Sequence, residues 1–178
     1  PNGDIMWTGA NVLKNSTGYN LTQLMVGSEG TLGLVTKIVL KLLPHPKFDL
    51  LMLVPFSDLE KAGAAVSAIF RAGFTPSALE LVEIDALKIV SKFVESTAVP
   101  VTDDVAAHLI IEVDGNHMET LMAEMEAIAA LLTGFECGEV FFADDAQQKA
   151  ELWKLRRRVA EAVKLAGYTI EEDTVVPR

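Results

Sequence analysis

Two stretches of the chain carry the same succession of patterns: an apolar run, an amphipathic segment and a second apolar run. In the first stretch, the apolar runs are residues 48 to 56 and 77 to 84, and each predicts a strand. Ser57 and Glu60 match a capping box, which starts a helix, and Gly73 suits its end. The helix repeats its apolar residues about once per turn, at Leu59, Ala62, Val66 and Phe70.

The second stretch repeats this order. Residues 108 to 113 and 138 to 143 predict strands, and Asn116 and Gly134 suit the two ends of a helix between them. The apolar residues of this helix are Leu121, Met125, Ile128 and Leu132. Two strand–helix–strand units form a duplicated split βαβ arrangement. We therefore expect an α+β, ferredoxin-like domain with an antiparallel sheet and helices on one face of it.

The flanking parts of the chain add three more elements. Alternation in residues 34 to 43 predicts a strand, which ends at the following "PHP" because proline cannot donate to a β-ladder. A long helix is expected from about residue 145 to Ala166, and residues 169 to 176 predict a last strand. The prolines also mark the domain boundary that we expect, between residues 1–46 and residues 47–178.

Composition and charge exclude several classes of protein. Half of the 178 residues are hydrophobic, which suffices for a packed core. The net charge of −10 argues against a nucleic-acid partner, because nucleic-acid binding depends on Lys and Arg. The single cysteine, Cys137, suits a reducing compartment. No apolar run reaches the roughly 20 residues that span a bilayer, and we expect a cytoplasmic protein.

The residues that carry chemistry do not form a complete catalytic set. His45, His108 and His117 lack the spacing of metal ligands, so we expect no metal and interpret them as surface or edge histidines. Neither a G-x-S-x-G nucleophile turn nor a nucleoside-triphosphate loop is present. The acidic residues 171 to 173 are consecutive strand positions, which point to alternate faces, and they predict a solvated strand end.

The glycine-rich segment "GSEGTLG" allows two interpretations. It places Gly27, Gly30 and Gly33 within seven positions, but its spacing is not that of the G-x-G-x-x-G fingerprint. Glycine permits a positive φ angle and close approach to the backbone. The segment is therefore either a tight turn before a strand or a run of backbone N–H groups placed against a cofactor.

Arg156 is the candidate for binding a substrate. Its planar guanidinium matches the two oxygens of a carboxylate. Arg157 and Arg158 follow it directly, so the alternative is that all three arginines lie on a solvated face of the helix.

Longer motifs add a resemblance to a known family. "KNSTGYNL" followed by "GSEGTLGLVT" resembles the closing part of the FAD-binding domain in the flavoprotein 2-hydroxyacid dehydrogenases. This family, within the vanillyl-alcohol-oxidase-like superfamily, includes the glycolate oxidase flavoprotein subunit and the D-lactate dehydrogenases. "ELWKLRRRVAEAV" and "EEDTVVPR" resemble its C-terminal cap domain. The resemblance implies that residues 1–46 end an FAD-binding domain and that residues 47–178 form a truncated cap domain.

The resemblance also implies the roles of particular residues. Arg156 matches an arginine that holds the substrate carboxylate in related enzymes. Ala160 and Glu171 stand where 2-hydroxyglutarate-type enzymes have threonine and lysine, which favours a small monoacid such as glycolate or lactate. The residues expected to line or support the FAD site are Gly18, Tyr19, Gly27, Glu29, Gly30, Thr31 and Gly33.

The activity implied by the resemblance is oxidation of a 2-hydroxy acid to the 2-oxo acid, with hydride transfer to FAD. The electrons then leave to an acceptor or to partner oxidase subunits. A peripheral position at the inner face of the membrane is an alternative to the free cytoplasmic state, and exposed apolar surface gives a route to a dimer.

The family's pyrophosphate-binding half would precede residue 1, and its histidine-rich segment would follow residue 178. We therefore expect this chain alone to be inactive and to purify without FAD. The alternative from another class is a free-standing ferredoxin-like module that binds a ligand or a subunit without catalysis.

Overall fold

The computed structural model describes residues 2–95, 99, 102–143 and 145–175. The chain divides into two compact units, Pro1–Pro44 and His45–Arg178. In the described part of the first unit, the one helix is α1 (Leu21–Met25), which Asn20 caps by accepting a hydrogen bond from the Gln23 backbone N–H at 3.1 Å. Most side chains of this unit are exposed.

The strand predicted for residues 34 to 43 is wrong. These residues have no regular secondary structure, and apolar side chains among them, such as Leu34 and Leu40, are exposed. A strand requires a neighbour whose N–H and C=O groups complete its ladder. No described segment pairs with these residues, so the alternating pattern has no sheet to join.

The second unit is built on a four-stranded sheet. Its strands are β1 (Phe48–Phe56), β2 (Ala78–Glu83), β3 (Ala107–Gly115) and β4 (Phe141–Phe142). They lie in the order β2-β3-β1-β4, and every neighbouring pair is antiparallel. The sequence predicted all four, but it placed the last one at residues 138 to 143.

The short β4 has a cause in its neighbour. β4 pairs Phe141 with Leu53 of β1, and continuing this ladder would bring Pro55 into it. Because proline has no backbone N–H, the regular ladder stops there. Gly138 still donates its N–H to the Pro55 carbonyl at 2.9 Å, and Cys137 makes an isolated bridge to Phe56.

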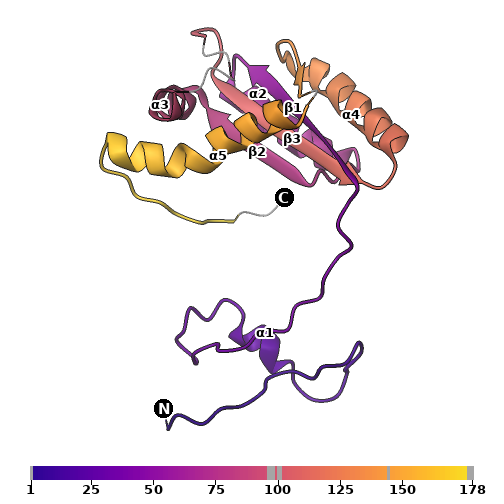
Figure 1. The fold of residues 1–178 in the computed structure, drawn as a ribbon, viewed down its shortest axis with the longest axis vertical. Coiled ribbons are helices and arrows are strands. Elements are labelled where there is room, and N and C mark those ends of the chain that lie inside the picture. The colour runs from indigo at the N-terminus through magenta and orange to yellow at the C-terminus, as the bar shows by residue number, and fades with distance from the viewer. Residues whose placement is uncertain (1, 96–98, 100–101, 144, 176–178) are drawn as a thin grey trace. The chain divides into compact units, whose positions relative to one another are not determined.

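Helices cover both faces of the sheet, which gives three layers (Figure 1). α2 (Leu59–Arg71) and α4 (Met118–Leu132) pack on one face, and a 3₁₀ turn (Thr133–Phe135) follows α4. α3 (Ile84–Val94) and α5 (Ala146–Ala166) pack on the other. The chain is therefore α+β, as predicted, but the expectation of helices on one face only is wrong, because α3 and α5 bury the second apolar face of the sheet.

The two central strands supply side chains to both layers of helices. On β1, Met52 and Val54 belong to the cluster under α2 and α4, whereas Leu51 and Leu53 belong to the cluster under α3 and α5. Successive strand residues point to opposite faces. This double burial explains why the sequence of β1 is a continuous apolar run rather than an alternating one.

The sequence predicted the buried face of α4 and not that of α2. All four residues predicted to face the core from α4 are buried. Of the four predicted for α2, only Ala62 is fully buried, and Leu59 is 42% exposed. The buried residues of α2 are Ala62, Ala65, Ala68 and Ile69. Three of these four are alanines, which a search for large apolar residues passes over.

The helix starts also differ from the prediction by one residue. Asp58, not Ser57, caps α2, and its carboxylate accepts hydrogen bonds from the backbone N–H groups of Glu60 at 2.7 Å and Lys61 at 3.3 Å. The cap of α4 is His117, not Asn116, and it makes no side-chain capping bond. Gly73 follows α2 with φ +91°, a left-handed conformation that favours glycine.

The C-terminal part of the second unit lacks the strand predicted there, and one edge of β1 carries a contact from α5. The last predicted strand is wrong over residues 169 to 175, which have no regular structure; residue 176 lies outside the described residues.

At the β4 edge of β1, Ala143 N–H donates to the Leu51 carbonyl. Further along that edge, Lys149 of α5 donates to the Asp49 carbonyl and pairs with the Asp49 carboxylate at 2.6 Å.

Candidate carboxylate site and glycine-rich loop

The helix α5 positions the candidate substrate residue. Asp145 caps it, and its carboxylate accepts a hydrogen bond from the Gln148 backbone N–H at 2.8 Å. Leu152 and Leu155 are buried against the sheet. Helical spacing places Trp153 and Arg156 beside this buried stripe, at the boundary between core and solvent.

An open cavity of about 400 Å³ lies at this boundary. Arg156 is 40% exposed there, and its Nε lies 2.8 Å from Oε2 of Glu80 on β2. The cavity therefore contains an ion pair between α5 and the edge of the sheet. The residues that line it are Glu80, Glu112, Trp153, Arg156 and Arg157.

The second acidic residue of the cavity, Glu112 of β3, is fixed by hydrogen bonds. Trp153 donates its indole N–H to Oε2 of Glu112 at 2.9 Å, and the Ser77 hydroxyl lies 3.2 Å from Oε1. In the β2–β3 register, Glu112 lies opposite Ala78, and Glu80 lies opposite Ile110. Both acidic side chains consequently start on the sheet face that α5 covers.

The three consecutive arginines have different surroundings. Arg157 donates its Nε–H to the Trp153 carbonyl at 3.1 Å. Arg158 lies 5.2 Å from the centre of the Phe93 ring and pairs with Glu161. Only Arg156 of the three pairs with a residue of the sheet. The run is therefore not a uniformly solvated face, because Arg156 pairs with the carboxylate of Glu80.

The glycine-rich segment lies in the first unit. Gly18, Gly27 and Gly30 have φ angles of +77°, +80° and +78°, and Glu29 has +49°. The positions that a Cβ would take at these three glycines have no other atom within 4 Å, so the backbone is open to close approach.

The other predicted FAD residues are less uniform. Tyr19 is 94% exposed, and the Thr31 backbone N–H and hydroxyl both donate to the Ser28 carbonyl, which closes a turn. At Gly33 a Cβ would lie 3.3 Å from the Met25 side chain, so this glycine makes room for its own turn. The segment therefore closes a turn at Ser28–Thr31, and its place against a cofactor stays a prediction.

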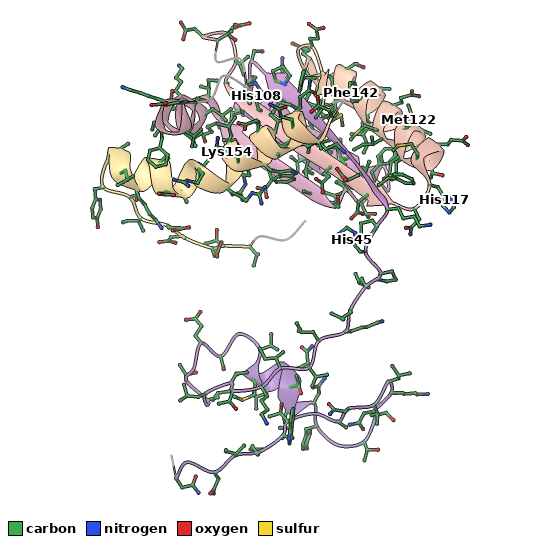
Figure 2. All side chains as sticks on the ribbon, viewed as in Figure 1. His45, His108, His117, Met122, Phe142 and Lys154 are labelled. Carbon is green, nitrogen blue, oxygen red and sulfur yellow. The ribbon has the colours of Figure 1, made fainter. Side chains whose placement is uncertain are left out.

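A second cavity, of about 530 Å³, lies in the same unit as α5 and contains His108. The prediction of a surface or edge histidine is wrong for His108, which is 2% exposed on β3, whereas His117 lies at the periphery (Figure 2). Among the described residues, Nδ1 of His108 has no hydrogen-bond partner, and burial lowers the pKa of the His108 imidazole to about 4. The half-buried Cys137 lines this cavity too, and burial raises the pKa of its thiol.

The described residues contain no group of three or more His, Cys, Asp or Glu placed to hold a metal ion. Within the same ranges, no helix combines the length and the apolar character needed to cross a membrane.

Comparison with known families assigns the chain. Residues 45–178 match the family described as FAD linked oxidases, C-terminal domain. The chain belongs to this family, and FAD is the cofactor that the family indicates. Two proteins described as FAD-linked oxidoreductases, both of Mycobacterium tuberculosis, are also similar to this chain, with 31% identity over its whole length.

The similar proteins include two kinds of hydroxyacid-oxidising enzyme. The chain is 34% identical to a D-lactate dehydrogenase of Anaerostipes hadrus and 35% identical to the glycolate oxidase subunit GlcD of Bacillus subtilis, over 99% of its own length in both cases. It is 31% identical to GlcD of Escherichia coli K12 over 90% of its length. The chain spans only 38%, 37% and 31% of these three proteins, respectively.

A solved structure supports the fold. Alkyldihydroxyacetonephosphate synthase superimposes on 86% of this chain with a TM-score of 0.61, and the chain covers 31% of that protein. The sequence identity is 18%, so the likeness concerns the fold alone.

Proposed function

We propose that this chain is part of an FAD-dependent oxidoreductase that oxidises a small 2-hydroxy acid, such as glycolate or D-lactate, to the 2-oxo acid. The observation that supports the proposal is the Arg156 cavity, where a partly exposed guanidinium already pairs with one carboxylate, that of Glu80. The names of the similar proteins, D-lactate dehydrogenase and glycolate oxidase subunit, support this choice of substrate.

The chain's own contribution is binding and orientation. FAD, when bound, supplies the acceptor for the hydride that leaves the α-carbon of the substrate. Arg156 would hold the substrate carboxylate, and the open backbone at Gly18, Gly27 and Gly30 would lie against the cofactor. We also assign Tyr19, Glu29, Thr31 and Gly33 to the support of this loop. Among the described residues we assign no acceptor for the hydroxyl proton.

The architecture is part of the same proposal. The strand order β2-β3-β1-β4 with antiparallel neighbours supports a ferredoxin-like cap domain over residues 47–178. Residues 1–46 would then complete the FAD-binding domain. The electron acceptor, or partner oxidase subunits such as those implied by the name GlcD, would take the electrons. We place the enzyme in the cytoplasm or at the inner face of the membrane.

The test uses the complete open reading frame that contains this sequence. Its purified product should carry FAD and reduce an artificial electron acceptor in the presence of D-lactate or glycolate. Arg156→Ala should raise KM about 10- to 100-fold, because a hydrogen bond to a charged group contributes roughly 1.5 to 3 kcal/mol. Arg158→Ala, the matched control, should change KM little, because Arg158 lies against the Phe93 ring and pairs with Glu161 instead of lining this cavity. A flavin-free, inactive product would instead favour a binding module without catalysis.

A further inference from the structure

Glu80 stands at the place where the proposed function puts the substrate. Its carboxylate lies against the Arg156 guanidinium, with 2.8 Å between Oε2 and Nε. We propose that Glu80 is an exchangeable counter-ion: the substrate carboxylate binds Arg156 by displacing Glu80, and Glu80 thereby sets the affinity of the site. This inference rests on the proposed function, because it takes Arg156 as the carboxylate-binding residue.

The surroundings of Glu80 permit the exchange. Glu80 lies on β2, an edge strand of the sheet, and its side chain is 32% exposed. Within the described part of the chain, Arg156 is its one ion-pair partner, and no hydrogen bond holds its carboxylate elsewhere. A half-exposed ion pair of this kind is weak, because water solvates both groups once they separate. Glu80 can turn into solvent without leaving a buried charge behind.

Glu112 provides the contrast within the same cavity. Its two carboxylate oxygens are held by the Trp153 indole and the Ser77 hydroxyl, which come from α5 and from the residue before β2. Displacing Glu112 would break both hydrogen bonds, whereas displacing Glu80 breaks one exposed contact. Glu80 is therefore the acidic residue that exchanges, and Glu112 is the one that stays.

The charges that line the cavity agree with a monocarboxylate. Two acidic residues face two arginines, so the cavity is neutral while Glu80 is in place. When Glu80 turns outward, one positive charge is unbalanced, and a single carboxylate restores neutrality. A second carboxylate on the substrate would instead meet the fixed negative charge of Glu112, and dicarboxylates are disfavoured.

The experiment measures binding of glycolate to the purified chain. Trp153 lines the cavity, so the NMR resonance of its indole N–H reports binding at the site. Trp7, in the first unit, is the one other tryptophan of the chain, and its indole resonance serves as an internal reference. Titration with sodium glycolate at constant ionic strength should shift the Trp153 resonance with a dissociation constant of about 10 to 100 mM. Trp7 should not shift.

Charge-neutral variants then test the role of Glu80. Glu80→Gln should bind glycolate about tenfold more tightly, because the competing charge is gone. Glu83→Gln removes the same charge from an exposed position of the same strand and should bind like the unmodified chain. Arg156→Gln should abolish the shift. Glu80→Thr, which suits a strand, should repeat the gain and replaces Glu80→Gln if that variant does not fold.

Three results would overturn the proposal. They are a Glu80→Gln affinity no higher than that of Glu83→Gln, a loss of binding in Glu80→Gln with the amide spectrum intact, and a glycolate shift that survives in Arg156→Gln. The kinetic test of Arg156→Ala in the full-length enzyme is independent of these outcomes. An active enzyme that depends on Arg156 but is indifferent to Glu80 would refute the exchange and leave the proposed function standing.

Discussion

The buried histidine of β3 makes the stability of the chain depend on pH in a way that can be calculated. His108 is 2% exposed, and burial lowers its pKa from 6.5 to about 4. Between these two values the unfolded chain binds a proton at this residue and the folded chain does not. Stability is therefore complete above about pH 6.5 and is lost as the pH falls toward 4.

The magnitude follows from the two pKa values. At about 1.4 kcal/mol per pH unit, the full loss of unfolding free energy below pH 4 is about 3 kcal/mol. Between about pH 7.5 and about pH 5, where the fold can still be assayed, the loss is about 2 kcal/mol. Such a loss is a large fraction of the stability of an ordinary domain.

The assay is urea unfolding of the purified chain at these two pH values, followed by circular dichroism. Carboxylates also titrate in this range, so His108→Gln serves as the reference: the pH-dependent loss in the unmodified chain should exceed that in the variant by about 2 kcal/mol. His117→Gln, at an exposed position, should keep the full loss. Equal pH dependence in the unmodified chain and His108→Gln would refute the argument that burial keeps His108 neutral.

Two further predictions concern the helix start and the core, both measured as unfolding free energies in urea. Asp58→Ala should cost about 1 kcal/mol because two backbone N–H groups lose their acceptor, whereas Ser57→Ala should change little; the reverse order would restore the capping box read from the sequence. Ile111→Ala should cost about 2 to 5 kcal/mol, because Ile111 is fully buried under α2 and α4, while Ile170→Ala, at a residue 73% exposed, should be nearly neutral. A near-neutral Ile111→Ala would mean that this core repacks freely.

The sequence predicted those elements that their own apolar periodicity and their flanking turn residues are enough to define. The four sheet strands, α4 and the end of α2 before Gly73 all follow from local periodicity and turn residues. Residues 34 to 43 have the same alternation, but the second condition for a strand, a pairing partner, is invisible in one segment. The shortening of β4 has a similar origin, because the proline that interrupts it lies on the neighbouring strand.

The candidate site was predictable at one residue and not at its partners. Arg156 could be singled out because a guanidinium suits a carboxylate. Glu80 and Glu112 are separated from it by more than 40 positions in sequence, and only the β2–β3 register and the packing of α5 bring the three together. His108 was misassigned for the same reason: the residues around its cavity, such as Leu53 and Cys137, come from separate parts of the chain.

The contact between Lys149 and Asp49 has a consequence for how separate copies of the chain meet. β4 covers only part of its edge of β1, and an uncovered strand is a template onto which another chain can add its own strand. The Lys149 ammonium group donates a hydrogen bond to the Asp49 carbonyl on that edge. An incoming strand would have to displace a charged, hydrated group there. We therefore expect the Lys149 side chain to disfavour edge-to-edge pairing of copies through this strand.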